Sequence, residues 1–592
     1  MMKKTLIIGC ILLCAVAAYA VPAHPGGFIR TLPDGTQQKV FLHGDEFFHW
    51  TDTDSIGILP ADAQPARAAR YQGRPNKVIG QPYLPKKGLV ILANFADLKF
   101  QKENTRAEMD SMINGKNYTY NGAYKSVREY FYDQSNGQYY PQFDVVGPVD
   151  LPYKYAYYGT NDNSGYDQYM GDVILDACHI ADTALGVDFS QYAQCDGIHI
   201  DFVFIYFAGP GENYAGVSAD HCWPMQYYME QSGQWINRDK HPNWQNELVI
   251  DGVKLNMFAY SNEVSPSNVR EGIGTFCHEF GHVLGLADYY NTDGAGYYNT
   301  LPTYWHIMDR GSWNNNGNVP PSYSPFEKFF LGWVTPQLLS KEQLVYTLPA
   351  DGKTCAYLPK SGAAINPTQY EDTVYYFENR QAQGWDSGIY DFSGPGVSKG
   401  MLIWRVVFNK NSWKNNAVNY PKNAPRVTIV PSDGGNTVYN TNVDVYPGRN
   451  NVTTRQLFKD WTLYRIKDTD GLITFQIDDS EPTGWQLPTE NTYRKVLDGE
   501  QVRIIDPKTN KLRTDEKNPD PKLRTRKATE IVMFWNLRYD KEEWVEGILY
   551  DPYSGKKFGV KFSLEKNGKD LKARYYKGKP ALGINATWTK ES

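Results

Sequence analysis

The amino-acid sequence predicts a multidomain chain in which an α/β domain is followed by all-β domains. Its 592 residues exceed what one hydrophobic core normally organises, so three or more folding units are expected. Apolar runs alternate with helical patterns up to about residue 335, which is typical of an α/β domain. Beyond that residue the helical patterns fade, and short strand-like runs are separated by turns rich in Gly, Asn and Pro.

The N-terminus has the pattern of a signal peptide over residues 1–20. Two lysines precede an apolar run over residues 6–18, and Ala18-Tyr19-Ala20 offers the small residues of a cleavage site. We therefore predict an exported protein, either secreted or periplasmic. Ile8-Gly9-Cys10 is similar to the start of a lipid-attachment box and leaves a lipoprotein as the alternative. No other apolar stretch approaches the roughly 20 residues of a membrane-spanning helix.

Residues 21–85 are predicted to form a propeptide. They are rich in Pro, Gly and Ala, and residues 61–70 have the composition of an exposed linker. Only residues 38–50 have a strand-like pattern. After a signal peptide, a segment of this composition is a candidate propeptide of an exported hydrolase.

The α/β domain is predicted over residues 86–335. Its two apolar runs, residues 89–95 and 198–207, are uninterrupted, as expected for strands that are covered on both faces. Helical patterns lie at residues 126–132, 169–185 and about 269–284. The last of these helices carries the candidate chemistry.

Two all-β segments are predicted after the α/β domain. Residues 336–480 are expected to form a β-sandwich, with strand-like runs at residues 373–377 and 401–407 among short turns. The composition changes near Pro482-Thr483-Gly484, after which Lys, Arg and Asp become frequent. Residues 484–592 are therefore predicted to be a separate small β domain.

Charge and cysteine content exclude several classes of protein. The net charge of −5 argues against nucleic acid as a partner and gives no attraction to anionic membranes. Of the seven cysteines, Cys10 and Cys14 lie in the predicted signal peptide. The remaining odd number leaves at least one thiol unpaired, and proximity in sequence makes Cys178 and Cys195 the candidate disulfide pair. The oligomeric state is not indicated.

The candidate site begins with the motif His278-Glu279-Phe280-Gly281-His282. Residues four apart on a helix share a face, so both imidazoles can reach one metal ion. Glu279 lies about 100° further round the helix, where it can contact a water molecule without binding the metal. Phe276 and Val283, together with Phe280, form an opposite apolar stripe that would pack on the core. By itself the motif is also compatible with two incidental histidines.

The residues after His282 supply the third predicted metal ligand. Gly285 can adopt the left-handed conformation that ends a helix and turns the chain. The turn would bring Asp288 back to the metal, which then has three protein ligands and one open position, as in catalytic zinc sites. The alternative is that Asp288 is an ordinary turn residue and that another acid is the third ligand.

These features together predict a secreted zinc metalloendopeptidase with protein or peptide substrates. Zinc would lower the pKa of its bound water and polarise the scissile carbonyl, and Glu279 would act as general base. A zinc amide hydrolase of cell-wall peptides and a non-catalytic binding protein remain as alternatives, although the intact Glu279 argues against the second. Calcium (Ca²⁺) is a second candidate cofactor, at the Asp/Asn/Gly clusters of residues 161–165 and 291–296, but neither has EF-hand spacing.

The sequence resembles the immune inhibitor A family of metallopeptidases over about residues 86–480. The matching motifs lie at residues 126–131, 201–203, 208–212, 278–288, 308–313, 327–333, 378–381 and 384–386. The resemblance implies a metzincin-like zincin catalytic domain with Asp288 as third ligand, Met308 in a turn beneath the zinc, secretion, and a zymogen with an N-terminal propeptide. Many metzincins place a Tyr two residues after this Met. Here Arg310 occupies that position, so the group that stabilises the oxyanion is left open.

The C-terminal segment resembles a second family, a small β-barrel-like domain of unknown function in exported bacterial proteins. The matching residues lie at 515–521, 523–524, 550–552, 555–556 and 588. This resemblance leaves open a binding role, a tethering role and an inert spacer.

Overall fold

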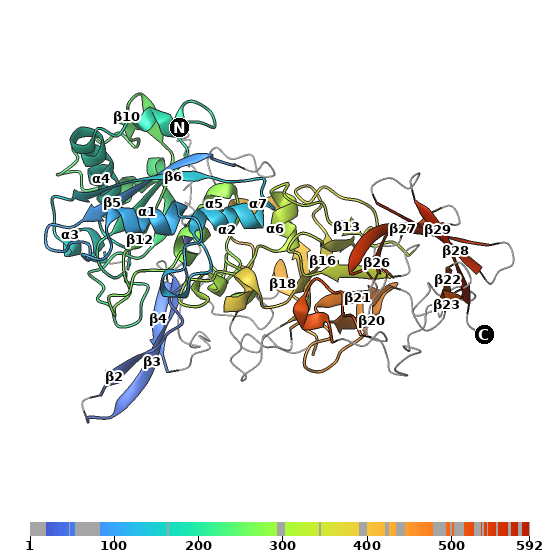
Figure 1. Ribbon diagram of the computed structural model, residues 1–592. Coiled ribbons are helices and arrows are strands. Elements are labelled where there is room, and N and C mark those ends of the chain that lie inside the picture. Colours follow the sequence, from blue (N-terminus) through green and yellow to red (C-terminus); the bar gives the residue numbers. More distant parts are fainter. Residues whose placement is uncertain are drawn as a thin grey trace, which may run out of the picture.

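The computed structural model, shown in Figure 1, describes residues 19–32, 34–45, 48–53, 83–162, 165–292, 302–341, 345–389, 399–420, 425–433, 444–477, 493–497, 500–501, 514–525, 534–535, 538–540, 543–551, 554–565, 570–577 and 583–590. The predicted signal peptide as far as residue 18, the lipid-attachment box, the linker at residues 61–70 and the composition change near residue 482 lie outside these ranges. None of the described helices is both long and apolar enough to cross a membrane.

A mixed six-stranded sheet forms the centre of the α/β domain, in the order β1-β9-β12-β8-β5-β6. Its strands are β1 (Tyr19–Ala20), β5 (Lys87–Asn94), β6 (Gln142–Asp150), β8 (Val203–Phe207), β9 (Met225–Tyr228) and β12 (Met257–Asn262). The four strands from β12 to β6 run parallel, whereas β9 is antiparallel to β12. The N-terminal strand β1 is added to β9 in the antiparallel sense.

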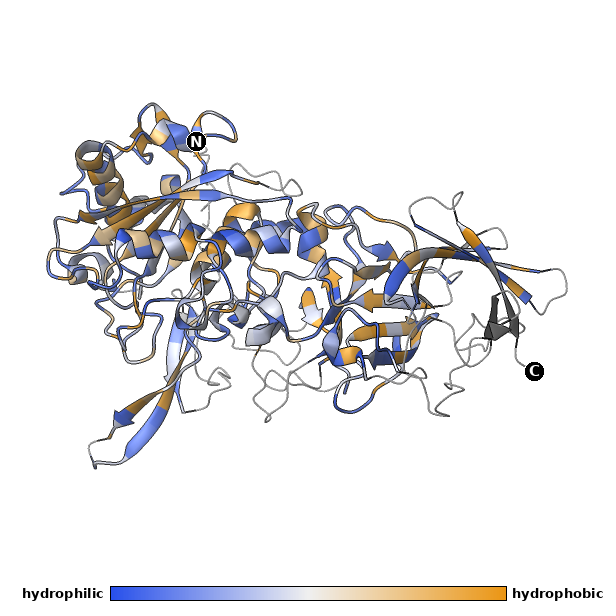
Figure 2. Cartoon of the chain, viewed as in Figure 1, coloured by the Kyte–Doolittle hydropathy of each residue, from blue (hydrophilic) through white to orange (hydrophobic). Residues whose placement is uncertain are grey.

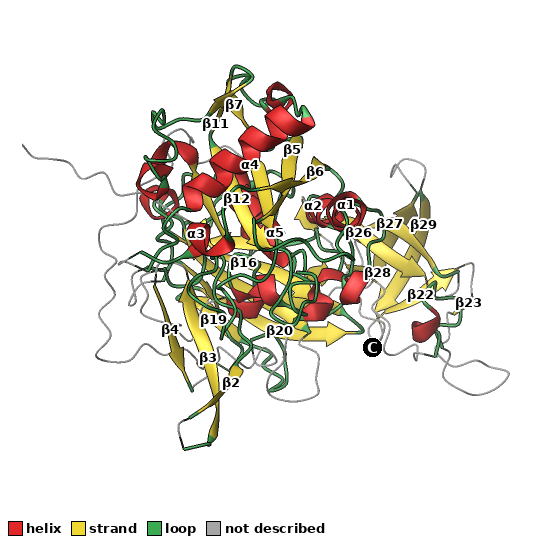
Figure 3. Cartoon of the chain, turned by 90° about the vertical axis from the view of Figure 1, so that its left-hand side faces the viewer, coloured by secondary structure: helices red, strands yellow, loops and turns green. Residues whose placement is uncertain are grey.

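Helices cover both faces of this sheet (Figures 1 and 3). One face packs on α4 (Met170–Leu185), and the other packs on α1 (Arg106–Asn114), α2 (Val127–Gln134) and α5 (Gly274–Leu284). In β5, Val90 and Leu92 pack in the layer that contains α5. Leu89 and Ile91 pack in the layer that contains α4. Because both faces are covered, the strand is apolar throughout, as Figure 2 shows for the centre of this sheet.

Local sequence signals set several element boundaries. Ser126 caps α2 in a capping box, in which its side chain and that of Glu129 each bond to the other residue's main-chain amide. The helix α5 begins at Gly274 and not near residue 269, because Val264 and Arg270 form a β-bridge just before it. The predicted strand over residues 198–207 is divided into β7 (His199–Ile200) and β8.

Shorter elements surround the domain. An N-terminal sheet, which projects from the domain in Figure 1, comprises β2 (Phe28–Thr31), β3 (Gln37–Asp45) and β4 (Phe48–Asp52). A second small sheet joins β7 to β11 (Val253–Leu255) and β10 (Val249–Ile250). The short α-helices are α3 (Tyr155–Gly159), α6 (Pro325–Phe330) and α7 (Lys410–Lys414). Short 3₁₀ helices lie at Tyr120–Gly122, Phe189–Tyr192, Met229–Trp235, Thr303–Trp305, Arg310–Trp313, Gly384–Gly388 and Pro521–Leu523.

Two further sheets follow the α/β domain and share one core. The first contains β13 (Gln337–Leu338), β15 (Ala356–Pro359), β16 (Thr373–Arg380), β17 (Gly400–Val407) and β18 (Val427–Ile429). The second contains β14 (Tyr346–Pro349), β19 (Arg455–Phe458), β20 (Trp461–Thr469) and β21 (Leu472–Gln476). Phe377 and Ile403 of the first sheet pack with Ile466 and Ile473 of the second, as in a β-sandwich.

The opposite face of the first sheet packs on the α/β domain. Tyr376 of β16 and Trp404 of β17 belong to the same hydrophobic cluster as Phe326 of α6 and Phe280 of α5. Residues on both sides of the predicted boundary at residue 335 therefore contribute to the same hydrophobic core.

The described strands of the C-terminal segment form an open sheet. They are β22 (Tyr493–Leu497), β23 (Glu500–Gln501), β24 (Phe534–Trp535), β25 (Arg538–Asp540), β26 (Glu543–Asp551), β27 (Lys556–Leu564), β28 (Asp570–Tyr576) and β29 (Ile584–Lys590). The order is β23-β22-β29-β28-β27-β26-β24, and β25 also pairs with β26. Since the outermost strands of this order do not pair with each other, the expected closed barrel is not formed by the described residues.

The predicted disulfide between Cys178 and Cys195 is wrong. All five cysteines after residue 20 are free thiols. Cys178 lies on the buried face of α4, whereas Cys195 is exposed in the loop after Tyr192. The two residues are close in sequence but lie in different environments, Cys178 inside the core and Cys195 at the surface.

Candidate metal centre

The helix α5 brings His278 and His282 to one buried point. The two residues are one helical turn apart and have no exposed surface. Their Nε2 atoms are 3.3 Å apart. The Nδ1 atom of His278 lies 2.7 Å from the carbonyl oxygen of Ile307, and that of His282 lies 3.1 Å from the carbonyl oxygen of Leu286. When each Nδ1–H donates to its carbonyl, the lone pair of each Nε2 faces the other ring, as in metal-binding histidines.

Gly285 turns the chain back toward these histidines. It ends α5 with a φ of +110°, in the left-handed region that favours glycine. The main-chain amide of Leu286 then donates to the carbonyl oxygen of Gly281, which closes the turn. Asp288 follows, fully buried, with Oδ1 at 3.2 Å from Nε2 of His278 and 3.3 Å from Nε2 of His282. The predicted turn thus places the three predicted ligands together.

The separations among these three atoms fit a zinc ion. A tetrahedral ion with ligands at about 2.0 Å has ligand atoms about 3.3 Å apart, and the observed separations are 3.2–3.3 Å. Three lone-pair donors this close repel one another unless a cation or a proton lies between them. Among the described residues, no donor other than the two imidazoles contacts Oδ1 of Asp288. Two imidazoles and one carboxylate are the donor set of catalytic zinc sites.

Without a metal, the charges of the three groups shift one another's pKa values. Burial lowers the pKa of His278, but the hydrogen bond to Asp288 and the charges of Glu279 and Asp288 outweigh burial and raise it to about 9. Burial lowers the pKa of His282 to about 4. Burial opposes ionisation of Asp288, but the two histidines hold its pKa well below the usual range. The aspartate is therefore ionised and ready to bind a cation.

Glu279 lies beside this cluster, and the main-chain amide of Val21 lies near its carboxylate. One carboxylate oxygen is within 4.8 Å of the ligand nitrogens of both histidines, yet neither oxygen has a hydrogen-bond partner of normal geometry in the described residues. Burial raises the pKa of Glu279 well above its usual value. Asp288 makes the tighter approach to both rings, so Glu279 is left free to act on a substrate or a water molecule.

A turn containing Met308 lies beneath α5. A Cβ atom on Gly281 would come within 2.7 Å of Sδ of Met308, so the glycine allows this close approach. The turn is closed by a bond from the amide of Asp309 to the carbonyl oxygen of His306. The carbonyl oxygen of Met308 accepts from the amide of Tyr289, next to Asp288. The turn therefore supports the third ligand as well as His278.

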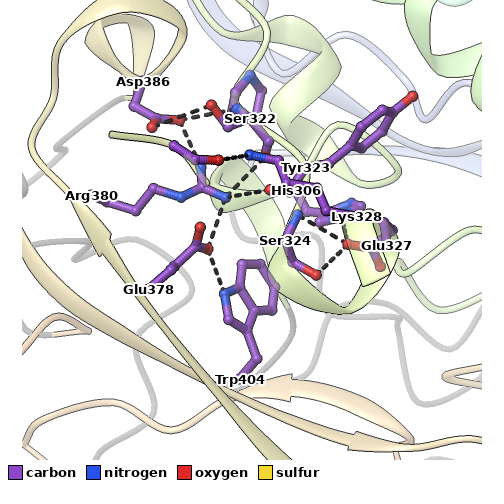
Figure 4. Close-up of polar contacts among 12 residues, drawn as sticks. His306, Ser322, Tyr323, Ser324, Glu327, Lys328, Glu378, Arg380, Asp386 and Trp404 are labelled. Atoms are coloured by element: carbon purple, nitrogen blue, oxygen red, sulfur yellow. Dashed lines mark hydrogen bonds and ion pairs between the residues drawn. The ribbon is translucent and has the colours of Figure 1, made fainter. Parts of the chain in front are cut away.

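A buried polar network ties this turn to the β-sandwich (Figure 4). Nε2 of His306 lies 2.9 Å from Oε2 of Glu327, which lies in the first turn of α6. The Arg380 guanidinium of β16 pairs with Asp386 at 2.6 Å and with Glu378 at 2.9 Å. It also donates to main-chain carbonyls at residues 322 and 323, just before α6. His306 is thus a satisfied buried histidine and contacts no metal ligand directly.

Residues 21–24, which we call the N-terminal segment, lie across this site. β1 aligns the chain antiparallel to the edge strand β9, and Val21 follows it, fully buried. The amide of Val21 lies near enough to the Glu279 carboxylate to lower its pKa. The indole N–H of Trp223 donates to the carbonyl oxygen of Val21 at 3.1 Å, and that of Trp313 donates to that of Pro22 at 2.9 Å. The sequence analysis assigned neither tryptophan this contact, although Trp313 lies in the matching motif at residues 308–313, because no spacing rule marks the contact.

The turn at Gly285 gives a direct test of the site's geometry. Replacing Gly285 by Ala should cost about 1–2 kcal/mol of stability through the positive φ, and it should also weaken metal binding by displacing Asp288. Gly186→Ala is the matched control, since Gly186 ends α4 at a φ of +65° on a helix that carries none of these ligands. Urea unfolding and zinc titration of both variants would be compared. Equal zinc affinities in the two variants would contradict the role of this turn.

The predicted calcium clusters gain no support from the structure. Residues 163–164 and 293–296 lie outside the described residues. Among the described residues, no residue of these two clusters belongs to a set of three His, Cys, Asp or Glu side chains close enough to share an ion. The calcium sites stay predictions.

The α/β fold, with this cluster on one of its helices, is similar to that of metallopeptidases in the segment that known proteins match. Residues 85–334 match the family model described as immune inhibitor A peptidase M6, catalytic domain. The chain is 26% identical over 326 residues to immune inhibitor A of Bacillus thuringiensis subsp. alesti, which covers 47% of this chain and 46% of that protein. It is 26% identical over 307 residues to the pre-pro-metalloprotease PrtV of Vibrio cholerae, which covers 44% of this chain and 31% of that protein.

These matches confirm both predicted resemblances. Residues 478–590 match a second family model, described as an uncharacterized protein conserved in bacteria. The chain spans less than half the length of the curated relatives it matches. The similarity to metallopeptidases therefore rests on residues 85–334.

Proposed function

We propose that this protein is a secreted zinc-dependent endopeptidase that hydrolyses peptide bonds in proteins. His278, His282 and Asp288 would hold the zinc, and Glu279 would be the general base. The main support is the convergence of three buried lone-pair donors beside a buried carboxylate whose oxygens have no hydrogen-bond partner of normal geometry among the described residues. A cluster with only a structural role would satisfy its own hydrogen bonds, because unpaired buried polar groups are destabilising.

The chain's own residues supply the proton transfers. Zinc, when bound, would act as a Lewis acid that lowers the pKa of a coordinated water and polarises the scissile carbonyl. Burial, which raises the pKa of Glu279, suits this carboxylate to accept a proton from the attacking water. The protonated Glu279 then donates that proton to the leaving amine. His278 and His282 keep their Nε2 atoms in position through the bonds that Nδ1 makes to main-chain carbonyls.

The proposal includes a division of the chain. We assign a signal peptide to residues 1–20, a propeptide to residues 21–85, a metzincin-like zincin catalytic domain to residues 86–335, a β-sandwich-like domain to residues 336–480 and a small β domain to residues 484–592. The metzincin-like assignment is supported by the antiparallel edge strand β9 and by the Met308 turn beneath α5. Export and a zymogen form are consistent with this arrangement.

The N-terminal segment supports the zymogen proposal. Its contacts with the site are made by residues after position 20, so they remain when the predicted signal peptide, which includes the paired residues Tyr19 and Ala20, is removed. Its Val21 amide faces Glu279, and two indole N–H groups hold its carbonyls. While this segment is in place, no substrate can reach the catalytic carboxylate.

Metal removal tests the proposed function. The processed enzyme, freed of residues 21–85, should cleave an unfolded protein, lose this activity after chelation and regain it with one equivalent of Zn²⁺. Mg²⁺ should not restore it, since it prefers oxygen ligands and octahedral geometry. Cleavage of cell-wall peptides without cleavage of unfolded proteins would favour the amide hydrolase instead. Full activity in the metal-free protein would refute the metal mechanism.

A further inference from the structure

We propose that Asn416, which lies outside the segment matched by the peptidase family model, is a positioning residue for the metal ligand Asp288. This inference rests on the proposed zinc site and adds a residue that the β-sandwich segment contributes to it. Asn416 is almost fully buried and lies 128 residues beyond Asp288 in the chain. The β-sandwich segment would therefore complete the metal centre as well as pack against it.

The backbone conformation at Asn416 directs its side chain toward Asp288. α7 ends at Lys414, and Asn416 follows with a φ of +48°, in the left-handed region where Asn is favoured at helix ends. Trp413 on α7 packs edge-on against Phe326 of α6, which fixes the helix on the α/β domain. The carbonyl oxygen of Asn416 accepts a hydrogen bond from Oγ1 of Thr292 at 2.9 Å. The backbone of Asn416 is thus held by contacts between the β-sandwich segment and the α/β domain.

Asn416 makes a paired contact with Asp288. Its Nδ2 donates to Oδ2 of Asp288 at 2.5 Å, and its Oδ1 accepts from the main-chain amide of Asp288 at 2.8 Å. The two bonds fix the plane of the carboxylate relative to its own backbone. Oδ2 is therefore occupied by a neutral donor, and Oδ1 remains for the two histidines and the metal. A neutral amide suits this position, because it orients the carboxylate without neutralising its charge.

A second asparagine anchors the same stretch of chain without contacting the ligand. Nδ2 of Asn419 donates to the carbonyl oxygen of Tyr289 at 2.7 Å, and its Oδ1 accepts from the amides of Arg426 and Val427. Asn419 therefore holds the loop in place, whereas Asn416 orients the carboxylate of Asp288. A substitution of Asn416 can be tested for its effect on the metal while Asn419 still holds the loop.

The test is zinc affinity of the full chain, measured by competition with a chromophoric chelator. Asn416→Gly removes the amide and keeps a backbone that tolerates the positive φ. It should weaken zinc binding about 10- to 100-fold, as loss of a hydrogen bond to a metal ligand does. Asn416→Asp keeps the shape but faces Asp288 with a second carboxylate, so it should weaken binding at least as much. Asn411→Ala, at an exposed position on α7, is the matched control and should bind zinc like the wild type.

Two further readouts separate positioning from general stability. The Co²⁺-loaded Asn416→Gly variant should show an altered visible spectrum, while the melting temperature of the metal-free variant stays close to that of the wild type. Wild-type zinc affinity and an unchanged Co²⁺ spectrum in both Asn416 variants would overturn the proposal. So would an equal loss of affinity in Asn411→Ala. If Asn416→Gly does not fold, Asn416→Asp decides by the same measurements.

These measurements need no substrate. If the wild type binds one zinc but cuts no protein, the proposed peptidase function fails while the ratio of zinc affinities still decides the role of Asn416. If the wild type cuts proteins and binds zinc with the same affinity as the Asn416 variants, the role of Asn416 is refuted and the peptidase function stands.

Discussion

Replacement of Glu279 by Gln is expected to lower kcat for peptide-bond hydrolysis by about 10²–10⁴-fold, the contribution of a positioned general base, while one zinc stays bound per chain. Gln has nearly the same shape but cannot accept the proton. Because the Glu279 carboxylate is fully buried and has no hydrogen-bond partner of normal geometry among the described residues, its replacement by a neutral amide should not lower the melting temperature. Turnover of an unfolded protein, zinc content and thermal unfolding would be measured on the processed forms.

Glu271→Gln is the matched control for this prediction. Glu271 is also a buried glutamate, and burial raises its pKa to about 7. Unlike Glu279, it accepts hydrogen bonds on one oxygen from the Tyr214 hydroxyl and the Asn262 amide, which an amide oxygen can also accept. The control should keep its kcat. A Glu279→Gln enzyme that cuts as fast as this control would refute the general-base role.

Release of the N-terminal segment should raise kcat/KM by on the order of 10³-fold, because a tethered segment acts at a millimolar effective concentration against an affinity in the micromolar range. A specific protease site placed between residues 53 and 83 would allow the same preparation to be assayed before and after cutting. The expected result is a near-silent precursor that becomes active when the released residues dissociate. Activity that does not change on cutting would contradict the zymogen proposal.

The indole contacts allow the same idea to be tested without cutting. Trp313→Phe removes the N–H that holds the carbonyl oxygen of Pro22 but keeps an aromatic ring. The uncut variant should therefore be more active than the uncut wild type. Trp461→Phe, on β20 far along the chain, is the control and should leave the precursor silent. Equal activity of the two uncut variants would show that the indole bond does not hold the segment in place.

The parts that could be predicted from the sequence are those that short-range geometry decides. The helical period predicts that His278 and His282 share one face of the helix. The freedom of glycine at positive φ predicts the turn at Gly285. The uninterrupted apolar run in β5 indicates that both faces of this strand are covered. In each case the residues that carry the signal lie within a few positions of the feature.

The parts that could not be predicted depend on contacts between distant segments. Nothing near Asn416 in sequence points to Asp288, and nothing near Val21 points to Glu279. The disulfide prediction failed for the same reason, because proximity in the chain does not report which cysteine enters the core. The expected barrel failed because closure depends on how the first and last strands of a sheet meet, which no local pattern encodes.

The shared core of the α/β domain and the β-sandwich has a consequence for how the enzyme is made. A ribosome synthesises His278, His282 and Asp288 well before β17 and Asn416, which lies 128 residues after Asp288. Until those later residues emerge, α5 and α6 lack the apolar surface of Tyr376 and Trp404, and Asp288 lacks its amide partner. The nascent chain therefore carries the whole sequence motif of a peptidase but not yet its finished metal centre. Timing of synthesis thus separates the appearance of the motif from the completion of the proposed metal centre.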